Sequence, residues 1–458
     1  MKDKNILVVG LGVSGIACIR GLNKLGARIF VYDESPKEKC DEKLQELKEI
    51  EASYFFGNNE IDKIDFDIID LAIKSPGIKY EVPIIKMLTE KHIRVISDIE
   101  ASYKITDATI VSITGTNGKT TTTTLIGEII KESKKNHKIT GNIGSGMFYD
   151  AVNSNEDDVL VAEVSSFQLA GTFCYKPHIA VITNITPDHM DFHHTYENYI
   201  DAKFRNVVNQ DENDYAILNY EDEIIMSFTD KIKAKKIFFS SERVLDEGIY
   251  VQDEKIMYSR DEKTEFIINI NDIFIPGKHN LENAMCAAGA ALSLGINTQT
   301  IANVLKNFKG VEHRLEFCGE YNGVKFYNDS KGTNTDASIK AIQGIEKPII
   351  LIAGGYDKNS SYDEFIKNFD NKVKSLILLG QTADKIEACA RSYGFTDIYR
   401  VENMDEAVKK CFELSVKGDN VVLSPACASW GMYPNYEVRG RDFKERVKYY
   451  GGNSTKAK

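Results

Sequence analysis

The chain has 458 residues, 42% of them hydrophobic, and its formal net charge at pH 7 is −11 with a pI of about 5.4. At ~150 residues per domain, this length predicts about three domains, each with enough apolar residues for its own core. The acidic balance argues against nucleic acid or an anionic membrane as the main partner.

The eight cysteines are scattered and form no CxxC pair. This is typical of reduced core residues rather than of a disulfide or zinc framework. The first five residues run directly into a predicted strand, so we predict no signal peptide. No apolar run approaches the ~18 residues of a membrane span. We therefore expect a soluble, cytoplasmic protein without membrane insertion.

Residues 1–104 alternate short β-rich runs with helical stretches. We predict strands at residues 5–9, 28–32, 68–73 and 93–96. Such alternation is typical of a parallel sheet with helices on its faces.

A glycine cluster, Gly-Leu-Gly-Val-Ser-Gly at residues 10–15, follows the first of these strands, and Asp33 follows the second. This pattern is the dinucleotide fingerprint. Taken alone, it gives about even odds of an NAD-binding site. The physical requirement is only a diphosphate over a helix N-terminus, which UDP also satisfies. We keep both ligands open at this point.

The second unit, residues 105–310, carries Gly-Thr-Asn-Gly-Lys-Thr-Thr at residues 115–121 after a strand at 110–113. Backbone N–H groups of such a turn face phosphate oxygens, Lys119 adds a positive charge, and Thr120 can ligate Mg²⁺. The strict Walker pattern is not met, because Ile113 stands where it has glycine. A flexible Gly/Thr turn is the alternative, and ATP binding is our working prediction.

Three further residues of this unit are candidates for catalysis. Glu163 ends a predicted strand, where a carboxylate can hold Mg²⁺ or cap a helix. His189 stands between two acids, so it is either a metal ligand or acid–base group or a surface histidine. Lys203 lies in a predicted helix at 196–208 and by itself reads as a solvated lysine. A β-rich stretch at 216–275 is predicted as an insertion or edge sheet.

The third unit, residues 311–458, has predicted strands near 324–327, 348–353, 375–379 and 420–423, with helical segments between them. Polar loops at 328–334, 353–358 and 424–429 follow three of these strands. Open α/β sheets bind ligands at the carboxyl ends of strands, so we expect the three loops to hold a small anion.

Taken in chain order, these motifs resemble the Mur ligases. The resemblance rests on the phosphate loop, on Ser-Ser-Phe-Gln-Leu at 165–169, Asp-His-Met-Asp at 188–191, His-Asn-Leu-Glu-Asn at 279–283, His313-Arg314, Asn-Asp-Ser-Lys at 328–331 and Ser-Pro-Ala-Cys-Ala-Ser at 424–429. Three of these strings are more specific to the members that add D-glutamate: Ser-Ser-Phe-Gln-Leu at 165–169, Asp-Ser-Lys at 329–331 and Ser-Pro-Ala-Cys-Ala-Ser at 424–429.

The resemblance implies an α/β protein of three domains: a UDP-binding Rossmann-like domain at 1–104, a central P-loop ATPase-like domain at 105–310, and a C-terminal Rossmann-like domain at 311–458 that binds the amino acid. It implies an ATP- and Mg²⁺-dependent ligase that joins UDP-N-acetylmuramoyl-L-alanine to D-glutamate through an acyl phosphate. We expect a cytoplasmic monomer that acts in peptidoglycan precursor synthesis.

The same resemblance implies roles for individual residues. Lys119, Glu163, His189 and Lys203 would be catalytic, and the metal would be held by Thr120, Glu163, His189 and, once carbamylated, Lys203. ATP would be bound by Gly115, Thr116, Asn117, Gly118, Lys119, Thr120, Thr121, Asn280, Asn283, Arg314 and Asp329.

The resemblance also implies binding residues for the UDP-substrate and for D-glutamate. The UDP-substrate would be bound by Val13, Ser14, Asp33, Glu34, Ser35, Gly77, Asn142, Ser165 and His189. D-glutamate would be bound by Lys331, Thr333, Lys358, Ser429 and Tyr436. The sequence departs from the family pattern at Gly332, Trp430, Tyr436 and the order Tyr356-Asp357-Lys358. A sister ligase that adds another amino acid and a non-catalytic nucleotide-binding module are the remaining alternatives.

Overall fold

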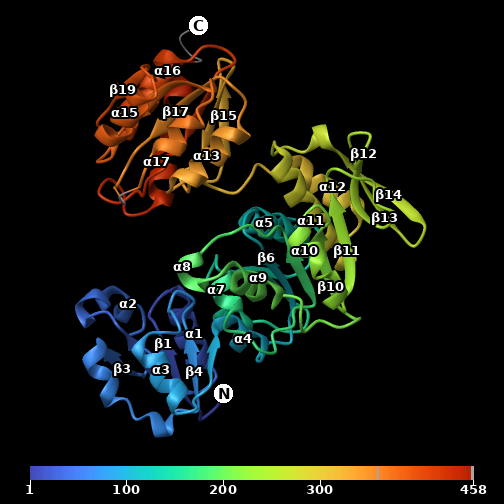
Figure 1. Ribbon diagram of the computed structural model, residues 1–458, viewed down its shortest axis with the longest axis vertical. Helices are drawn as coiled ribbons and strands as arrows, with labels where there is room; N and C mark the ends of the chain where they lie inside the picture. Colours follow the sequence, from blue (N-terminus) through green and yellow to red (C-terminus); the bar gives the residue numbers. More distant parts are fainter. Residues whose placement is uncertain (358–359, 455–458) are drawn as a thin grey trace. The chain divides into compact units, whose positions relative to one another are not determined.

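The structure is a computed structural model, which describes residues 1–357 and 360–454 (Figure 1). It consists of two compact units, each described here by itself. The first contains Met1–Ile273 and Lys278–Asn307, and the second contains Phe274–Gly277 and the chain from Phe308 onward. The first unit holds two sheets and the second holds one.

The N-terminal sheet has five parallel strands in the order β3-β2-β1-β4-β5. Its elements are β1 (Asn5–Val9), α1 (Val13–Lys24), β2 (Arg28–Asp33), α2 (Asp41–Glu46), β3 (Ser53–Phe56), β4 (Leu71–Lys74), α3 (Pro83–Glu90), β5 (Val95–Ser97) and α4 (Asp98–Tyr103). The chain leaves β1 on one side and returns at β4 on the other, so the general rule for such sheets predicts a ligand crevice where β1 and β4 end.

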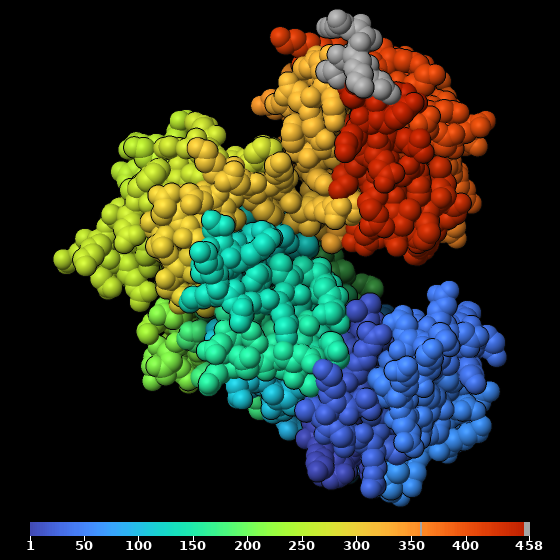
Figure 2. Space-filling model, turned by 180° about the vertical axis from the view of Figure 1, so that it is seen from behind, coloured from blue at the N-terminus to red at the C-terminus, as the bar shows by residue number. Residues whose placement is uncertain are grey.

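Both faces of this sheet are covered, as its apolar strands predict. Leu7 and Val9 of β1 join one buried cluster, whereas Ile6 and Val8 join another on the opposite face. Phe148, which belongs to the next sheet's helices, completes the second cluster and is 0% exposed. The two sheets of the first unit therefore share packing, and their surfaces adjoin where blue meets cyan in Figure 2.

The central sheet has nine strands in the order β14-β13-β12-β11-β10-β9-β6-β8-β7. Its strands are β6 (Thr109–Thr114), β7 (His137–Gly141), β8 (Val159–Glu163), β9 (Ile179–Ile182), β10 (Tyr215–Asn219), β11 (Lys235–Ser240), β12 (Gly248–Gln252), β13 (Lys255–Arg260) and β14 (Lys263–Asn269). Strands β6 to β12 pair in parallel, and β13 and β14 extend the edge antiparallel. The β-rich stretch at 216–275, predicted as an insertion or edge sheet, is part of the central sheet: β10, β11 and β12 continue it in parallel, and only β13 and β14 form an antiparallel edge.

The helices around this sheet are α5 (Lys119–Glu132), α6 (Met147–Val152), α7 (Ser166–Leu169), α8 (Met190–His193), α9 (Tyr196–Phe204), α10 (Glu223–Ser227), α11 (Lys278–Ser293) and α12 (Thr298–Asn307). Short 3₁₀ turns occur in the first unit, at Lys37–Lys39, Asn58–Lys63, Phe66–Ile68, Thr229–Lys231 and Ile270–Asp272. The predicted helix at 196–208 ends earlier, at Phe204.

The sheet of the second unit has the order β15-β16-β20-β17-β18-β19, with only β15 antiparallel to its neighbour. Its elements are β15 (Glu316–Tyr321), β16 (Val324–Asn328), α13 (Thr335–Gly344), β17 (Ile349–Ala353), α14 (Asp363–Lys367), β18 (Val373–Leu378), α15 (Ala383–Ser392), β19 (Ile398–Arg400), α16 (Met404–Leu414), β20 (Asn420–Leu423) and α17 (Tyr436–Ser454).

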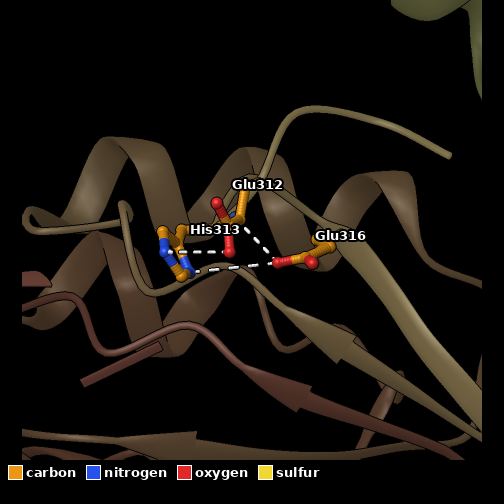
Figure 3. Close-up of side chains that lie close together, drawn as sticks. All are labelled: Glu312, His313 and Glu316. Carbon is orange, nitrogen blue, oxygen red and sulfur yellow. Dashed lines mark hydrogen bonds and ion pairs between the residues drawn. The ribbon is translucent and has the colours of Figure 1, made fainter. Parts of the chain in front are cut away.

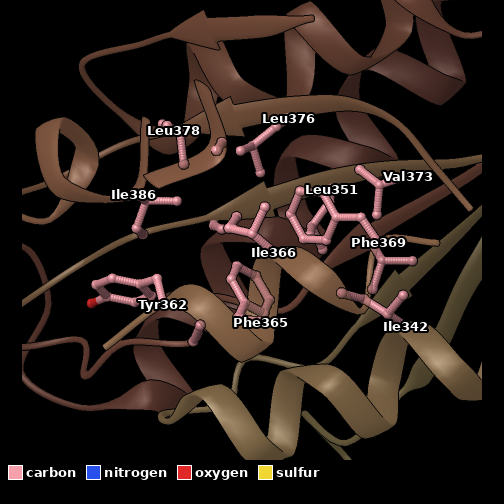
Figure 4. Close-up of a cluster of buried hydrophobic side chains, with 14 of the residues drawn as sticks. Ile342, Leu351, Tyr362, Phe365, Ile366, Phe369, Val373, Leu376, Leu378 and Ile386 are labelled. Atoms are coloured by element: carbon pink, nitrogen blue, oxygen red, sulfur yellow. The ribbon is translucent and has the colours of Figure 1, made fainter. Parts of the chain in front are cut away.

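The core of the second unit forms where one face of this sheet meets its helices (Figure 4). Leu351 and Leu376 from neighbouring strands pack with Phe365, Ile366 and Ile386 from the helices, and each is at most 4% exposed. Strand β20 pairs in parallel with β16 on one side and with β17 on the other. The three polar loops that follow these strands therefore begin at adjacent positions on one edge.

The main division between the two units lies at Asn307 and Phe308, and the short segment Phe274–Gly277 also belongs to the second unit. The predicted domain boundaries at 104/105 and 310/311 stay predictions. Among the described residues, no helix is both long and apolar enough to cross a membrane.

Candidate active site

The phosphate loop connects β6 to α5, as predicted. Gly115 (φ +147°) and Gly118 (φ +83°) adopt backbone conformations that favour glycine. A Cβ atom on Gly115 would lie 1.9 Å from Thr183 Oγ1, and one on Gly118 would lie 2.2 Å from Asn283 Oδ1. The two glycines are therefore required both by the turn and by the close approach of its neighbours.

The segment after β9 supports this loop from the side. The backbone N–H of Asn117 donates to Asn184 Oδ1 over 2.9 Å, and Thr183 Oγ1 donates to the Asn117 carbonyl over 2.6 Å. The hydroxyls of Thr116 and Tyr199 share a hydrogen bond of 2.9 Å. The loop is thus held in place before any nucleotide arrives.

Two lysines meet at the carbonyl oxygen of Gly115. Lys119 Nζ donates to it over 2.8 Å and to the Thr116 carbonyl over 3.0 Å. Lys203 Nζ, from α9, donates to the same Gly115 oxygen over 2.8 Å. The structure therefore brings Lys203 to the phosphate loop, 88 positions away in sequence from Gly115.

Lys203 is not the solvated lysine that its sequence context alone indicates. It is 1% exposed, and its ammonium lies 4.7 Å from the centre of the Tyr199 ring. Burial, reinforced by the nearby charge of Lys119, holds the pKa of Lys203 well below its ordinary value. The environment therefore makes this lysine easier to deprotonate than an exposed one.

Glu163 ends β8, beside the strand that leads into the phosphate loop. It is 2% exposed, and its Oε1 accepts a hydrogen bond of 2.9 Å from Asn142 Nδ2. Among the described residues, its Oε2 is buried without a hydrogen-bond donor. A carboxylate oxygen in this state fits a cation ligand, because burial without a partner is costly.

His189 caps the N-terminus of α8 in the left-handed conformation (φ +55°). Its ring packs on Phe167, with 4.7 Å between ring centres, and its Nε2 lies 3.5 Å from Asp188 Oδ2. The side chain is 46% exposed, so the ring nitrogen remains accessible. Phe167 belongs to the segment that follows Glu163, which places the histidine close to that segment.

The predicted adenine residues come from α11, which packs along α5. Thr122 Oγ1 donates to Asn283 Oδ1 over 3.3 Å, and Asn283 Nδ2 donates to Asn280 Oδ1 over 3.4 Å. Both asparagines therefore lie beside the first turn of the phosphate-loop helix. Arg314 and Asp329, the other predicted nucleotide residues, belong to the second unit.

In the N-terminal sheet, the glycine loop lies at the predicted crevice. A Cβ on Gly15 would lie 1.9 Å from the Gly10 carbonyl, whereas the space around Gly12 and Gly77 is open to 4 Å among the described atoms. The Asp33 carboxylate accepts hydrogen bonds from the backbone of Leu11 and Ser35, at 2.8 and 2.9 Å. In this structure Asp33 therefore shapes the loop, while Val13 and Glu34 are exposed.

A buried carboxylate that the sequence reasoning missed connects the two sheets. Asp98 Oδ2 accepts from Ser14 Oγ over 2.9 Å and from Gln168 Nε2 over 3.0 Å. Gln168 in turn forms a capping box with Ser165 at the start of α7. Two predicted UDP-substrate residues, Ser14 and Ser165, are thus linked through Asp98. Nothing in the local sequence marks this aspartate.

The second unit brings together most of the predicted D-glutamate residues. Lys331 Nζ lies 5.8 Å from the centre of the Tyr436 ring, and Ser330 Oγ donates to the Tyr436 carbonyl over 2.8 Å. Thr333 follows in the same loop, and its N–H donates to the Lys331 carbonyl over 2.8 Å. Ser429 lies in the neighbouring loop after β20. Lys358 lies outside the described residues.

Asp329 is buried at the end of β16. Its Oδ2 accepts from Ser424 Oγ over 2.7 Å and its Oδ1 from the Leu315 N–H over 3.3 Å. Burial raises the pKa of Asp329 to about 7. The Nε of Arg314, also in this unit, is buried without an acceptor among the described residues.

Glu312, His313 and Glu316 also lie close together and form a possible metal cluster (Figure 3). However, Lys444 Nζ donates to Glu312 over 2.6 Å and to Glu316 over 2.7 Å. The lysine ammonium already balances both carboxylates. The cluster is therefore explained without a metal ion.

Comparison with known proteins accounts for nearly the whole chain. The N-terminal domain of MurD-like Mur ligases matches residues 4–97, the Mur ligase middle domain matches 113–291, and the Mur ligase glutamate ligase domain matches 313–427. Relatives named UDP-N-acetylmuramoylalanine–D-glutamate ligase are 49% identical in Thermoanaerobacter sp. (strain X514) and 46% identical in Clostridioides difficile (strain 630). Each alignment covers 98% of this chain and at least 98% of the relative.

Solved structures share the fold at much lower identity. The UDP-N-acetylmuramate–alanine ligase MurC from Thermotoga maritima has a TM-score of 0.60 at 18% identity, over 98% of this chain and 99% of its own. The MurF ligase from the same organism, solved with ADP, has a TM-score of 0.56 at 15% identity, over 93% of this chain and 95% of its own.

Proposed function

The chain belongs to the Mur ligase family, and on that premise we propose that it ligates D-glutamate to UDP-N-acetylmuramoyl-L-alanine with hydrolysis of ATP. The products are the amide, ADP and phosphate. The extent of the likeness to ligases of this name supports the substrates, because it covers 98% of the chain.

The observation that carries the chemistry is the position of Glu163 beside the phosphate loop. Strand β8, which Glu163 ends, pairs with β6, which leads into that loop. A nucleoside triphosphate bound by the loop would place its terminal phosphate near the Glu163 carboxylate. This carboxylate is buried, and among the described residues its Oε2 has no hydrogen-bond donor.

A carboxylate is a poor electrophile, so amide formation needs a leaving group on it. Transfer of the γ-phosphoryl group to the substrate carboxylate gives an acyl phosphate, and attack by the amine of D-glutamate then releases phosphate. Lys119, at the start of α5, would balance the charge that spreads over the transferring oxygens. The N–H groups of the loop and of the first turn of α5 bind the remaining phosphates.

Mg²⁺ fits the donor set of this site, and we propose Thr120, Glu163, His189 and carbamylated Lys203 as the residues that would hold it. The ion would supply neutralisation of phosphate charge during transfer. An ammonium cannot ligate a cation, so Lys203 contributes only after reaction of its uncharged amine with carbon dioxide. The burial of this amine and its lowered pKa support this step.

The substrate residues form part of the same proposal. Residues for the UDP-substrate are Val13, Ser14, Asp33, Glu34, Ser35, Gly77, Asn142, Ser165 and His189; for the adenine and phosphates, Asn280, Asn283, Arg314 and Asp329; for D-glutamate, Lys331, Thr333, Lys358, Ser429 and Tyr436. The link of Ser14 to Ser165 through Asp98 supports a single path for the UDP-substrate across the first unit.

A ligase assay with a panel of amino acids tests the proposal. Phosphate release with ATP, Mg²⁺ and UDP-N-acetylmuramoyl-L-alanine should require D-glutamate. Higher turnover with L-alanine, lysine or meso-diaminopimelate would contradict it and would indicate a sister ligase. Tight binding of NADH, followed by fluorescence, would contradict UDP at the glycine loop. We also propose that the protein is cytoplasmic and monomeric. Light scattering on the purified protein tests its oligomeric state.

A further inference from the structure

A buried arginine lies beneath the loops that follow β16 and β20. Arg439, in the first turns of α17, is 3% exposed. Its Nε donates to Ser330 Oγ over 2.9 Å, and its Nη2 donates to the Ser330 carbonyl over 2.8 Å. The guanidinium thus holds both the side chain and the backbone of Ser330.

The same guanidinium reaches the second loop. Nη1 and Nη2 each donate to the Cys427 carbonyl over 3.2 Å. Because the fork of an arginine is planar and rigid, these contacts fix the spacing between Ser330 and Cys427. Ser330 directly precedes Lys331, and Cys427 lies two residues before Ser429, the two proposed amino-acid contacts of these loops.

The third loop, after β17, contacts the loop after β20 and lies next to Arg439. The Tyr356 N–H donates to the Ala428 carbonyl over 2.9 Å. A Cβ on Gly355 would lie 2.3 Å from that carbonyl and 3.3 Å from Arg439 Nη1. Arg439 therefore contacts or borders all three loops at the carboxyl edge of the sheet.

The acceptors of Arg439 are neutral, although burying a charge is costly unless it is hydrogen-bonded. Burial lowers the pKa of Arg439 to about 10, so the side chain still carries its charge near neutral pH. Ser330 also donates to the Tyr436 carbonyl over 2.8 Å, which ties the loop back to the start of the arginine's own helix. A positive charge is thus fixed directly behind the proposed binding loops for an anionic amino acid.

We propose that Arg439 is the positioning residue of the amino-acid site: it sets the spacing between the Lys331 loop and the Ser429 loop. It does so from behind, without touching the substrate itself. This inference rests on the proposed function, because it takes these loops as the binding site of the incoming amino acid.

Steady-state kinetics of the full chain tests the proposal, with Arg439→Met and Arg439→Lys as variants. Arg441→Met removes a charge from an exposed position of the same helix and is the control. We expect Arg439→Met to raise KM for D-glutamate about 30-fold, the effect of losing a charge-assisted hydrogen-bond pair. KM for ATP and for the UDP-substrate should stay within about twofold, and Arg439→Lys should restore only part of the loss, since an ammonium lacks the planar fork.

Two further measurements separate positioning from a general structural role. Guanidinium ion added at millimolar concentration to Arg439→Ala should lower KM for D-glutamate again. Hydrogen exchange of residues 329–333 and 426–429 should speed up in Arg439→Met and not in Arg441→Met. A parallel rise of all three KM values, or unchanged exchange in both loops, would overturn the inference.

The two proposals can fail separately. If the unaltered protein prefers another amino acid, the proposed function is wrong, and the Arg439 variants are then measured with that amino acid. If the unaltered protein uses D-glutamate but Arg439→Met leaves its KM unchanged, the function stands and the inference about Arg439 fails. The exchange measurement decides the structural part in either case, since it needs no substrate.

Discussion

Lys119 and Lys203 donate hydrogen bonds to the same acceptor, the carbonyl oxygen of Gly115, each over 2.8 Å. Two ammonium groups at one oxygen repel each other, and the repulsion is strong where water is excluded. This repulsion is relieved when Lys119 moves away to bind an anion, or when Lys203 loses its charge. The charge of Lys119 therefore contributes to the lowered pKa of Lys203.

The first prediction concerns Lys119. Lys119→Met should lower ATP-dependent phosphate release by about three orders of magnitude, because the charge on the transferring oxygens loses its partner. Lys131→Met, in the exposed last turn of the same helix, serves as the control and should retain activity. Activity of Lys119→Met close to that of the unaltered protein would favour a non-catalytic nucleotide-binding module.

The second prediction concerns the metal. Glu163→Gln keeps the size of the side chain and an acceptor for Asn142, but it removes the charge that a cation requires. The Mg²⁺ concentration for half-maximal activity should rise about 100-fold. Glu156→Gln, an exposed position just before β8, should leave it unchanged. An equal Mg²⁺ requirement in both variants would remove Glu163 from the proposed metal site.

The third prediction concerns Lys203. Incubation with ¹³C-labelled bicarbonate should produce a lysine carbamate signal in the ¹³C NMR spectrum of the full chain. The signal should be absent from Lys203→Arg, which keeps a positive charge but has no amine that forms a stable carbamate. If the same signal persists in Lys203→Arg, another lysine is modified and the proposed ligand is wrong.

The fourth prediction compares two glycines of the N-terminal loop. Gly15→Ala places a Cβ 1.9 Å from the Gly10 carbonyl, so it should destabilise the fold by about 2 kcal/mol, a typical cost of overpacking. Gly12→Ala meets no described atom within 4 Å and should leave the melting temperature unchanged. Because that space faces the ligand crevice, Gly12→Ala should instead raise KM for the UDP-substrate. Thermal unfolding and steady-state kinetics of both variants test this. A lower melting temperature for Gly12→Ala than for Gly15→Ala would contradict the prediction.

The fifth prediction concerns pH and the second unit. Asp329 has a folded-state pKa of about 7, above the ~3.9 of an unfolded chain. Between these values only the folded state holds the proton, so the free energy of unfolding should fall as pH rises from about 4 to 7. The full difference is about 4 kcal/mol at most.

Asp329→Asn removes this titration and should flatten the pH profile across the same range. Unfolding of the second unit can be followed by the fluorescence of Trp430, the single tryptophan of the chain. A variant profile parallel to that of the unaltered protein would show that another group causes the pH dependence.

The sequence predicted the fold where strands are apolar and missed elements where they are not. The predicted strand at 5–9 matches β1, because four of its five residues are buried. Strand β7 was missed, since His137–Gly141 contains a single aliphatic residue and is recognisable only from its pairing with β8. Strand β4 was displaced by several residues, because its apolar run begins inside a 3₁₀ turn.

For the site, local motifs predicted loops but not the contacts between distant segments. The phosphate loop follows from its glycines, and its position after β6 is confirmed. Local spacing alone marks neither Lys203, which was predicted only from the family resemblance, nor Asp98, because the burial of both depends on how α9 and α4 pack. Arg439 likewise resembles any helical arginine until its hydrogen bonds are traced to Ser330 and Cys427. These roles depend on tertiary contacts, which local spacing does not encode.

The buried side chain of Phe148 has a consequence for how the chain can be divided. It is contributed by α6, yet it fills the core beneath β1 and packs against Gly21 of α1. A fragment that stops at residue 104 would keep the apolar side chains that surround Phe148 but would lack Phe148 itself. Their apolar surface would then be exposed to water. The N-terminal and central sheets should accordingly fold and unfold as one cooperative body, and truncation at that boundary should yield an aggregation-prone fragment rather than an isolated substrate-binding domain.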